Sequence, residues 1–156
     1  MIVLSFIIMR LLLQRVASAS IMVDDKIIGQ IGHGILILAG FRKGDKQVSI
    51  KKLADKCINL RIFEDEESRM NLSLLDIKGE LLVISQFTLY ANCHKGRRPS
   101  FDESMLPDEA NRFYELLIEE FARSGLKVER GVFGAKMQIE LLNDGPVTIS
   151  LDDDEI

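Results

Sequence analysis

Ile-Leu-Ile-Leu-Ala-Gly-Phe at residues 35–41 is the stretch of sequence that decides the fold class. An unbroken apolar run of this length, preceded by the tight connection Gly32-His33-Gly34, is typical of a strand covered on both faces. A second strongly apolar strand is predicted over residues 81–89. The sequence therefore predicts a buried sheet with other elements packed on both of its sides.

Shorter alternating segments on either side of these runs predict further strands. They cover residues 10–23 (two strands in succession), 26–30, 61–63, 136–142 and 147–151. Turn residues separate them, with Asp-Asp at residues 24–25 and Asn-Asp-Gly-Pro at residues 143–146. Residues 64–71 form a charged loop in this interpretation, and residues 91–104 a long one.

Two segments change to the helical period. Residues 46–60 place five apolar side chains mainly on one face, namely Val48, Leu53, Ala54, Cys57 and Leu60. A second helix begins at Pro107 and stops near Gly125, with a buried stripe of Phe113, Leu116, Leu117 and Phe121. Many strands and two main helices indicate a mixed α/β fold, with mostly antiparallel or mixed sheets covered by the helices.

Composition narrows the class of protein. The chain has 156 residues, 47% of them hydrophobic and 28% charged, which fits one domain and excludes collagen, low-complexity disorder and a disulfide scaffold. The net charge of −4 argues against non-specific coating of nucleic acid, although a local basic patch can still dock one RNA end. The two cysteines and two histidines are scattered, so no zinc site is expected, and so few cysteines suit a reducing cytosol.

The first residues allow two interpretations. A signal peptide cleaved after Ala17-Ser18-Ala19 fits poorly, because no basic residue precedes the apolar run and Arg10 and Arg15 interrupt it. The run is also shorter than the roughly 20 residues that span a bilayer. We expect residues 1–8 to be an extension or a misassigned start, residues 9–151 a single domain, and residues 152–156 an acidic tail.

Three polar segments are candidates for chemistry. Ser-Gln-Phe-Thr-Leu at residues 85–89 fits either an edge strand with one polar face or a cluster of donors that holds an ester and its oxyanion. Residues 143–148 (NDGPVT) fit an ordinary trans hairpin turn or a cis Gly-Pro bond. The basic loop at residues 94–98 fits a solvated loop or a phosphate contact.

These segments together resemble the D-aminoacyl-tRNA deacylase family, also called D-tyrosyl-tRNA deacylase. Six motifs follow the order of that family: residues 14–16 (QRV), 69–72 (RMNL), 85–89 (SQFTL), 96–101 (GRRPSF), 131–135 (GVFGA) and 143–148 (NDGPVT). The resemblance covers residues 9–151. It implies the family's fold, with a barrel-like core, and a cytoplasmic homodimer whose active site lies at the dimer interface.

The resemblance also implies a substrate and a mechanism. The enzyme would hydrolyse the ester of D-aminoacyl-tRNA, and of glycyl-tRNA mischarged on other tRNAs, without metal or cofactor and with no membrane or DNA partner. L-amino acids would be rejected sterically, because excluding one enantiomer serves every D side chain. This is chiral proofreading, a form of translation quality control.

The implied site residues follow the motifs. Ser85, Gln86, Phe87 and Thr88 would surround the scissile ester, and Phe133 and Met137 the terminal adenosine. Gly145 and Pro146 would form the cross-subunit chirality gate, and Arg15 would support it. The candidate phosphate contacts are Lys95, Arg97 and Arg98. We expect a cis Gly145–Pro146 bond.

Several alternatives stay open. Either Thr88 is the nucleophile or the 2′-hydroxyl of the tRNA assists the reaction. We favour the RNA because no His, Asp or Lys lies near Thr88 in sequence to take its proton. A related deacylase that removes alanine from threonine tRNA has Pro where Ser85 stands and a trans Gly-Pro bond. A non-catalytic binder of RNA 3′ ends and a purely structural dimer are the other two alternatives.

Overall fold

The computed structural model of the protein describes residues 9–155, so the expected extension at residues 1–8 lies outside the described residues. The fold is mixed α/β, as predicted, and its main sheet has six strands and a nearly closed, barrel-like form. The strands of this sheet are β1 (Arg10–Val23), β2 (Lys26–Ile31), β3 (Gly34–Gly40), β6 (Glu80–Ser85), β7 (Val128–Arg130) and β8 (Gln138–Asp152).

Strand β1 organises the sheet because its two halves have different neighbours. Its first half pairs with β3 and its second half with β2, while β8 pairs along its other edge. These ladders are antiparallel, whereas β3–β6 and β6–β7 are parallel. The sequence suggested two strands at residues 10–23, but one strand with a change of partner is found.

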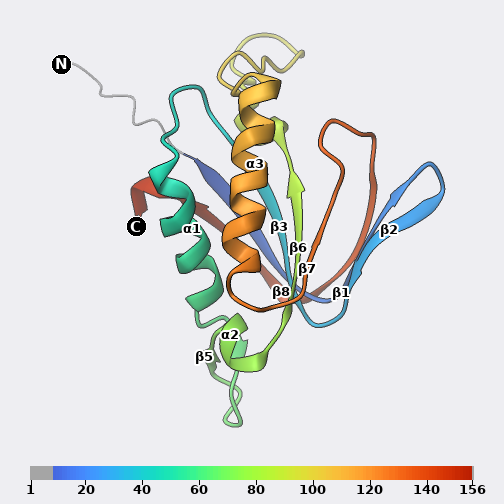
Figure 1. Cartoon of the computed structure of the whole chain (residues 1–156), viewed down its shortest axis with the longest axis vertical. Coiled ribbons are helices and arrows are strands. Elements are labelled where there is room, and N and C mark those ends of the chain that lie inside the picture. Colours follow the sequence, from blue (N-terminus) through green and yellow to red (C-terminus); the bar gives the residue numbers. More distant parts are fainter. Residues whose placement is uncertain (1–8, 156) are drawn as a thin grey trace.

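Two helices cover one face of the sheet, and Figure 1 shows them side by side. They are α1 (Val48–Asn59) and α3 (Pro107–Ala122). A short helix, α2 (Leu74–Ile77), and the small hairpin of β4 (Phe63–Glu64) and β5 (Met70–Leu72) lie beside α1 at one end of the molecule, and residues 153–155 form a last 3₁₀ turn. No helix among residues 9–155 combines the length and the apolar character needed to cross a bilayer.

Both predicted helices exist, but their buried faces differ slightly from the expectation. In α1, Val48 is 63% exposed and Ile50 is buried in its place. In α3, Tyr114 is fully buried whereas Leu116 is half-buried. Tyr114 can be buried because its hydroxyl donates a 2.7 Å hydrogen bond to the Val83 carbonyl of β6.

The core confirms that β3 is covered on both faces. Ile35, Ile37 and Ala39 pack into the cluster under α1 and α3. Leu36, on the opposite face, packs into a second cluster with side chains of β1, β2 and β6. This alternation explains why the strand has no polar position.

Three strand boundaries differ from the prediction. Strand β6 ends at Ser85, and a 3₁₀ turn, η1 (Phe87–Tyr90), replaces its expected end. Residues 136–142 and 147–151 are not two strands joined by a hairpin turn. Most of both belong to β8, which follows one direction along β1 and is irregular around residues 143–148. Asp152, assigned to the tail, lies in β8 and forms a 2.8 Å ion pair with Arg10.

Candidate functional site

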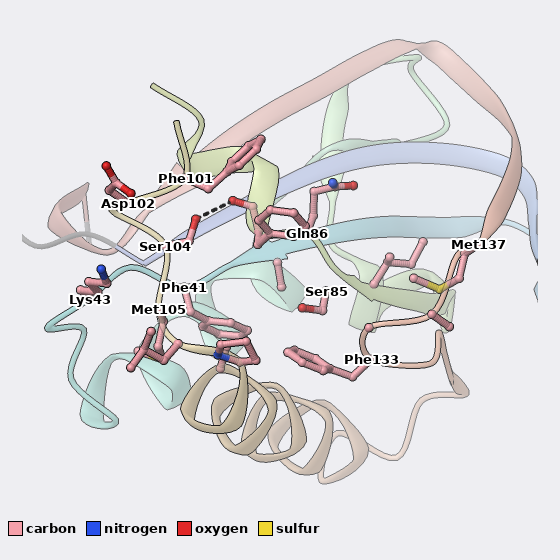
Figure 2. Close-up of a pocket in the computed structure, with 18 of the residues that line it drawn as sticks. Phe41, Lys43, Ser85, Gln86, Phe101, Asp102, Ser104, Met105, Phe133 and Met137 are labelled. Atoms are coloured by element: carbon pink, nitrogen blue, oxygen red, sulfur yellow. Dashed lines mark hydrogen bonds between the residues drawn. The ribbon is translucent and has the colours of Figure 1, made fainter. Parts of the chain in front are cut away.

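A cavity of about 650 Å³ opens where β6 ends (Figure 2). This volume is within the range of about 300–1,000 Å³ found for small-molecule sites. Its walls come from the ends of β3 and β6, the segment before α3, the first turns of α3 and the segment before β8. The predicted residues among its lining are Ser85, Gln86, Phe87, Phe133 and Met137. Residues predicted from two distant segments of the chain, one at residues 85–87 and one at residues 133–137, therefore meet at one cavity.

The end of β6 positions the polar side chains. The Gln86 backbone N–H still donates to the Ala39 carbonyl of β3, at 2.8 Å, and the chain then turns into η1. Ser85 lies on the same face of β6 as Leu81 and Val83, which are buried under the helices. Its hydroxyl therefore points into the half-buried floor of the cavity, as Figure 2 shows.

Backbone donors lie beside Ser85. Among the hydrogen bonds of residues 9–155, none uses the backbone N–H of Phe87 or of Thr88 as its donor. The Gln86 side-chain amide donates to the Thr88 hydroxyl, and Thr88 itself is exposed and does not line the cavity. Free amides next to a hydroxyl can bind the negative oxygen that develops during attack on an ester.

The aromatic wall includes residues that the sequence analysis did not assign. Phe87 is 56% exposed and packs edge-to-face against Phe101, with ring centroids 4.9 Å apart. The buried Ser104 hydroxyl donates to the Phe87 carbonyl at 3.1 Å, which ties η1 to the segment before α3 (Figure 2). Phe101 ends the GRRPSF motif, so the motif carried this signal, but Ser104 and Met105 had none.

A buried carboxyl supports the loop beside the cavity. Asp45 accepts a 2.6 Å hydrogen bond from the backbone N–H of Arg42, and its other oxygen has no partner among the described residues. Burial raises the pKa of Asp45 to about 6. The neighbouring Lys43 lines the cavity and is exposed.

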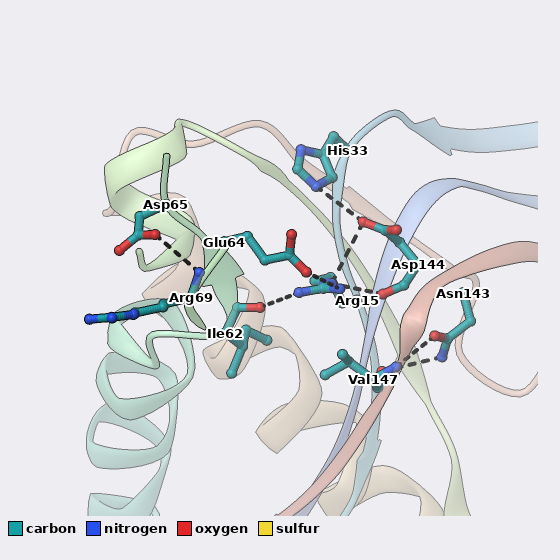
Figure 3. A network of polar contacts seen from close by, with 9 residues as sticks. All are labelled: Arg15, His33, Ile62, Glu64, Asp65, Arg69, Asn143, Asp144 and Val147. Atoms are coloured by element: carbon teal, nitrogen blue, oxygen red, sulfur yellow. Dashed lines mark hydrogen bonds and ion pairs between the residues drawn. The ribbon is translucent and has the colours of Figure 1, made fainter. Parts of the chain in front are cut away.

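Arg15 lies in a separate network, shown in Figure 3. Its buried guanidinium donates to the Asp144 carbonyl and to the Ile62 carbonyl, both at 2.7 Å. The Asp144 carboxylate lies 3.6 Å from Arg15 and 3.7 Å from His33. Arg15 thus holds the backbone directly before Gly145, and its role in supporting a chirality gate stays a prediction.

The Gly145–Pro146 segment lies in the irregular part of β8 and is exposed. Its peptide bond is cis, as expected. Gly145 has φ 146°, and a Cβ added there would lie 2.8 Å from Val147 Cγ2 and 2.9 Å from Val147 N, so only glycine fits. The Asn143 side chain accepts from the Val147 N–H at 2.8 Å and donates to its carbonyl, which fixes the segment (Figure 3).

The structure does not bring all predicted residues together within one chain. Among the described residues that line the 650 Å³ cavity, neither Gly145 nor Pro146 is found. Lys95, Arg97 and Arg98 are exposed, and none of them lines it. Among residues 9–155, no three His, Cys, Asp or Glu side chains are grouped as metal ligands.

Comparison with known proteins identifies the family. The sequence profile of the D-Tyr-tRNA(Tyr) deacylase family matches residues 12–152. The chain belongs to the D-aminoacyl-tRNA deacylase family. The D-aminoacyl-tRNA deacylase of Thermosipho africanus is 54% identical over 148 residues, which cover 95% of this chain and 99% of the relative. The relative of the same name from Aquifex aeolicus is 52% identical over 148 residues, with 95% and 100% covered.

Solved structures support the deacylase family fold. The structure of a protein named c-Myc DNA Unwinding Element Binding Protein is 39% identical and has a TM-score of 0.85, covering 91% of this chain and 97% of its own. A probable eukaryotic D-amino acid tRNA deacylase is 18% identical with a TM-score of 0.82, covering 93% and 99%. At 18% identity, the likeness to this second structure shows a shared fold and nothing more.

Proposed function

We propose that the protein hydrolyses the ester bond of D-aminoacyl-tRNA and releases free D-amino acid and intact tRNA. The observation that carries the proposal is the cavity at the end of β6, where Ser85 and the free amide of Phe87 meet an apolar wall. The apolar part suits the terminal adenosine, and the donors suit the ester. Relatives at 52–54% identity are named D-aminoacyl-tRNA deacylases, which supports the same activity for this chain.

The proposed reaction adds one water to the ester. A water oxygen attacks the carbonyl carbon, and the oxyanion that forms accepts a hydrogen bond from the Phe87 amide, which lines the cavity. The bond from the carbonyl carbon to the ribose oxygen then breaks. The ribose oxygen takes a proton and leaves as the free hydroxyl of the tRNA. We assign the proton transfer to the neighbouring 2′-hydroxyl of the ribose rather than to Thr88.

The proposal includes a homodimer in which Gly145 and Pro146 of the partner subunit close the cavity. In the dimer their carbonyls hold the α-amino group and leave no space for an L side chain. The exposure of both residues and the fixed backbone around them support this arrangement, since an exposed, rigid segment can enter a neighbouring cavity. Glycine has no side chain, so glycyl-tRNA would also pass.

One structural neighbour suggests a different function. The 39% identical protein is named for binding a DNA unwinding element. The net charge of −4 offers little attraction for duplex DNA. The cavity of about 650 Å³ is also too small for a DNA double helix. We propose that tRNA in the cytoplasm, and not DNA, is the nucleic-acid partner.

The test is hydrolysis of D-Tyr-tRNA by the wild type and by Ala135→Trp, which fills the cavity from its wall. We expect release of D-tyrosine by the wild type and at least about a hundredfold loss in the variant, because the ester can no longer reach the donors. Ala122→Trp, on an exposed position of α3, is the matched control and should be active. Binding of the tRNA without any release of tyrosine would favour the non-catalytic RNA binder.

A further inference from the structure

One cationic side chain stands at the rim of the cavity. Lys43 is the sole lysine or arginine among the described residues that line it. Lys43 is exposed, and no carboxylate lies within ion-pair distance of its ammonium group among residues 9–155. Figure 2 shows Lys43 and Asp102 at the same end of the cavity and Met137 at the opposite end.

The backbone that carries Lys43 is fixed against the facing wall. The Lys43 N–H donates to the Glu103 carbonyl, and the Met105 N–H donates to the Phe41 carbonyl, both at 3.0 Å. Arg42 adds a 3.1 Å ion pair to Glu103. These bonds join the loop after β3 to the segment before α3, so only the flexible side chain of Lys43 is free to move.

We propose that Lys43 binds the phosphate that links the terminal adenosine to the preceding nucleotide of the tRNA; this inference rests on the proposed function. An adenosine bound against the apolar wall carries its 5′-phosphate away from the base. A phosphate cannot be buried among phenylalanine and methionine side chains without a large desolvation cost, so it stays at the rim. There, an unpaired ammonium group is the charge-assisted donor that suits it.

This assignment differs from that of the basic loop. Lys95, Arg97 and Arg98 follow η1 in sequence, but none of them lines the cavity. They therefore remain candidates for phosphates farther along the RNA. Asp102 shares the rim with Lys43, and its carboxylate opposes a phosphate there. The pair gives two variants with opposite expected effects.

The experiment compares two ligands that are not hydrolysed: 3′-deoxy-3′-(D-tyrosylamino)adenosine with and without a 5′-phosphate. Calorimetry should show that the wild type binds the phosphorylated ligand roughly fivefold to tenfold more tightly, the usual effect of one exposed charge-assisted contact. Lys43→Ala should reduce this ratio to within about twofold of one, and Lys43→Arg should keep most of it. Asp102→Asn should increase it.

Lys46→Ala is the matched control, because Lys46 is exposed on the same loop but does not line the cavity. It should keep the wild-type ratio. Equal binding of both ligands by the wild type, or an unchanged ratio in Lys43→Ala, would overturn the assignment. A ratio lost instead in Arg97→Ala/Arg98→Ala would move the phosphate to the basic loop. Failure of the wild type to bind either ligand or to hydrolyse D-Tyr-tRNA would overturn the proposed function itself.

Discussion

Thr88 accepts a hydrogen bond from the Gln86 amide, and among residues 9–155 no carboxylate, imidazole or amine is bonded to its hydroxyl. A threonine nucleophile needs such a base to remove its proton. Thr88→Ala should therefore keep most of the activity, within about tenfold of the wild type. A tRNA ending in 2′-deoxyadenosine should be cleaved at least about a hundredfold more slowly, the usual value of lost proton-transfer assistance.

Single-turnover rates with both substrates check this prediction. An inactive Thr88→Ala together with rapid cleavage of the deoxy substrate would make Thr88 the nucleophile. Serine at this position gives a further control, because Thr88→Ser keeps the hydroxyl that Gln86 binds.

Asp45 makes the stability depend on pH. Burial raises its pKa from the ordinary 3.8 to about 6, so between these values the folded protein holds a proton that the unfolded chain releases. Its contribution to the free energy of unfolding is therefore greatest below pH 4. This contribution falls as the pH rises from about 4 through 6.

Urea unfolding of Asp45→Asn and wild type at pH 4 and pH 7 measures this effect. The asparagine oxygen can still accept the Arg42 N–H, so the variant should gain stability relative to the wild type as the pH rises. Asp25→Asn, in an exposed turn, controls for the loss of one charge. A difference between Asp45→Asn and wild type that is the same at both pH values would contradict the buried-carboxyl explanation.

Helix α3 is joined to β6 by the Tyr114 hydroxyl, which donates to the Val83 carbonyl inside the core. In Tyr114→Phe that carbonyl still accepts the Gly131 N–H, so no buried acceptor is left without a partner. We expect a loss of about 1 kcal/mol in the free energy of unfolding. Chemical denaturation should show a lower midpoint concentration with an unchanged m-value. A midpoint equal to that of the wild type would contradict a stabilising role for this hydrogen bond.

The elements differ in how well the sequence predicts them. Pro107 and the apolar stripe fix α3, and the unbroken run at residues 35–41 fixes β3, because each signal is local. The predicted end of β6 at residue 89 was wrong. Gln86 continues the hydrogen bonding with β3 for one residue, and the chain then turns into η1. The single strand β8 was missed because Asn-Asp-Gly-Pro is typical of a turn, whereas β1 pairs on both sides of it.

The candidate site was predictable to a similar degree. Ser85, Gln86 and Phe133 stand in motifs, and all three line one cavity. Ser104 and Lys43 lie in loops with no period, and only the fold places them on the same cavity. The relation between Gly145 and a cavity of another subunit stays a prediction.

At the scale of the whole molecule, the net charge of −4 makes long-range attraction of RNA weak. Binding should then depend on about two to four phosphate contacts, with log K falling against log salt at a slope of about −0.7 per contact. Replacing Arg97 and Arg98 by Ala should flatten this slope and raise the KM, with the preference for D over L unchanged. A slope equal to that of the wild type would assign the basic loop to structure alone.

The ratio of kcat/KM for D-Tyr-tRNA to kcat/KM for L-Tyr-tRNA tests most directly the proposal that the enzyme is specific for D-aminoacyl-tRNA. Steric exclusion of the L side chain by Gly145 and Pro146 should make the ratio at least about a hundred, equivalent to roughly 3 kcal/mol. Arg15→Lys should lower it, because an ammonium group cannot hold the Asp144 and Ile62 carbonyls together as the guanidinium does. Equal hydrolysis of the two enantiomers by the wild type, or faster hydrolysis of the L ester, would contradict the account.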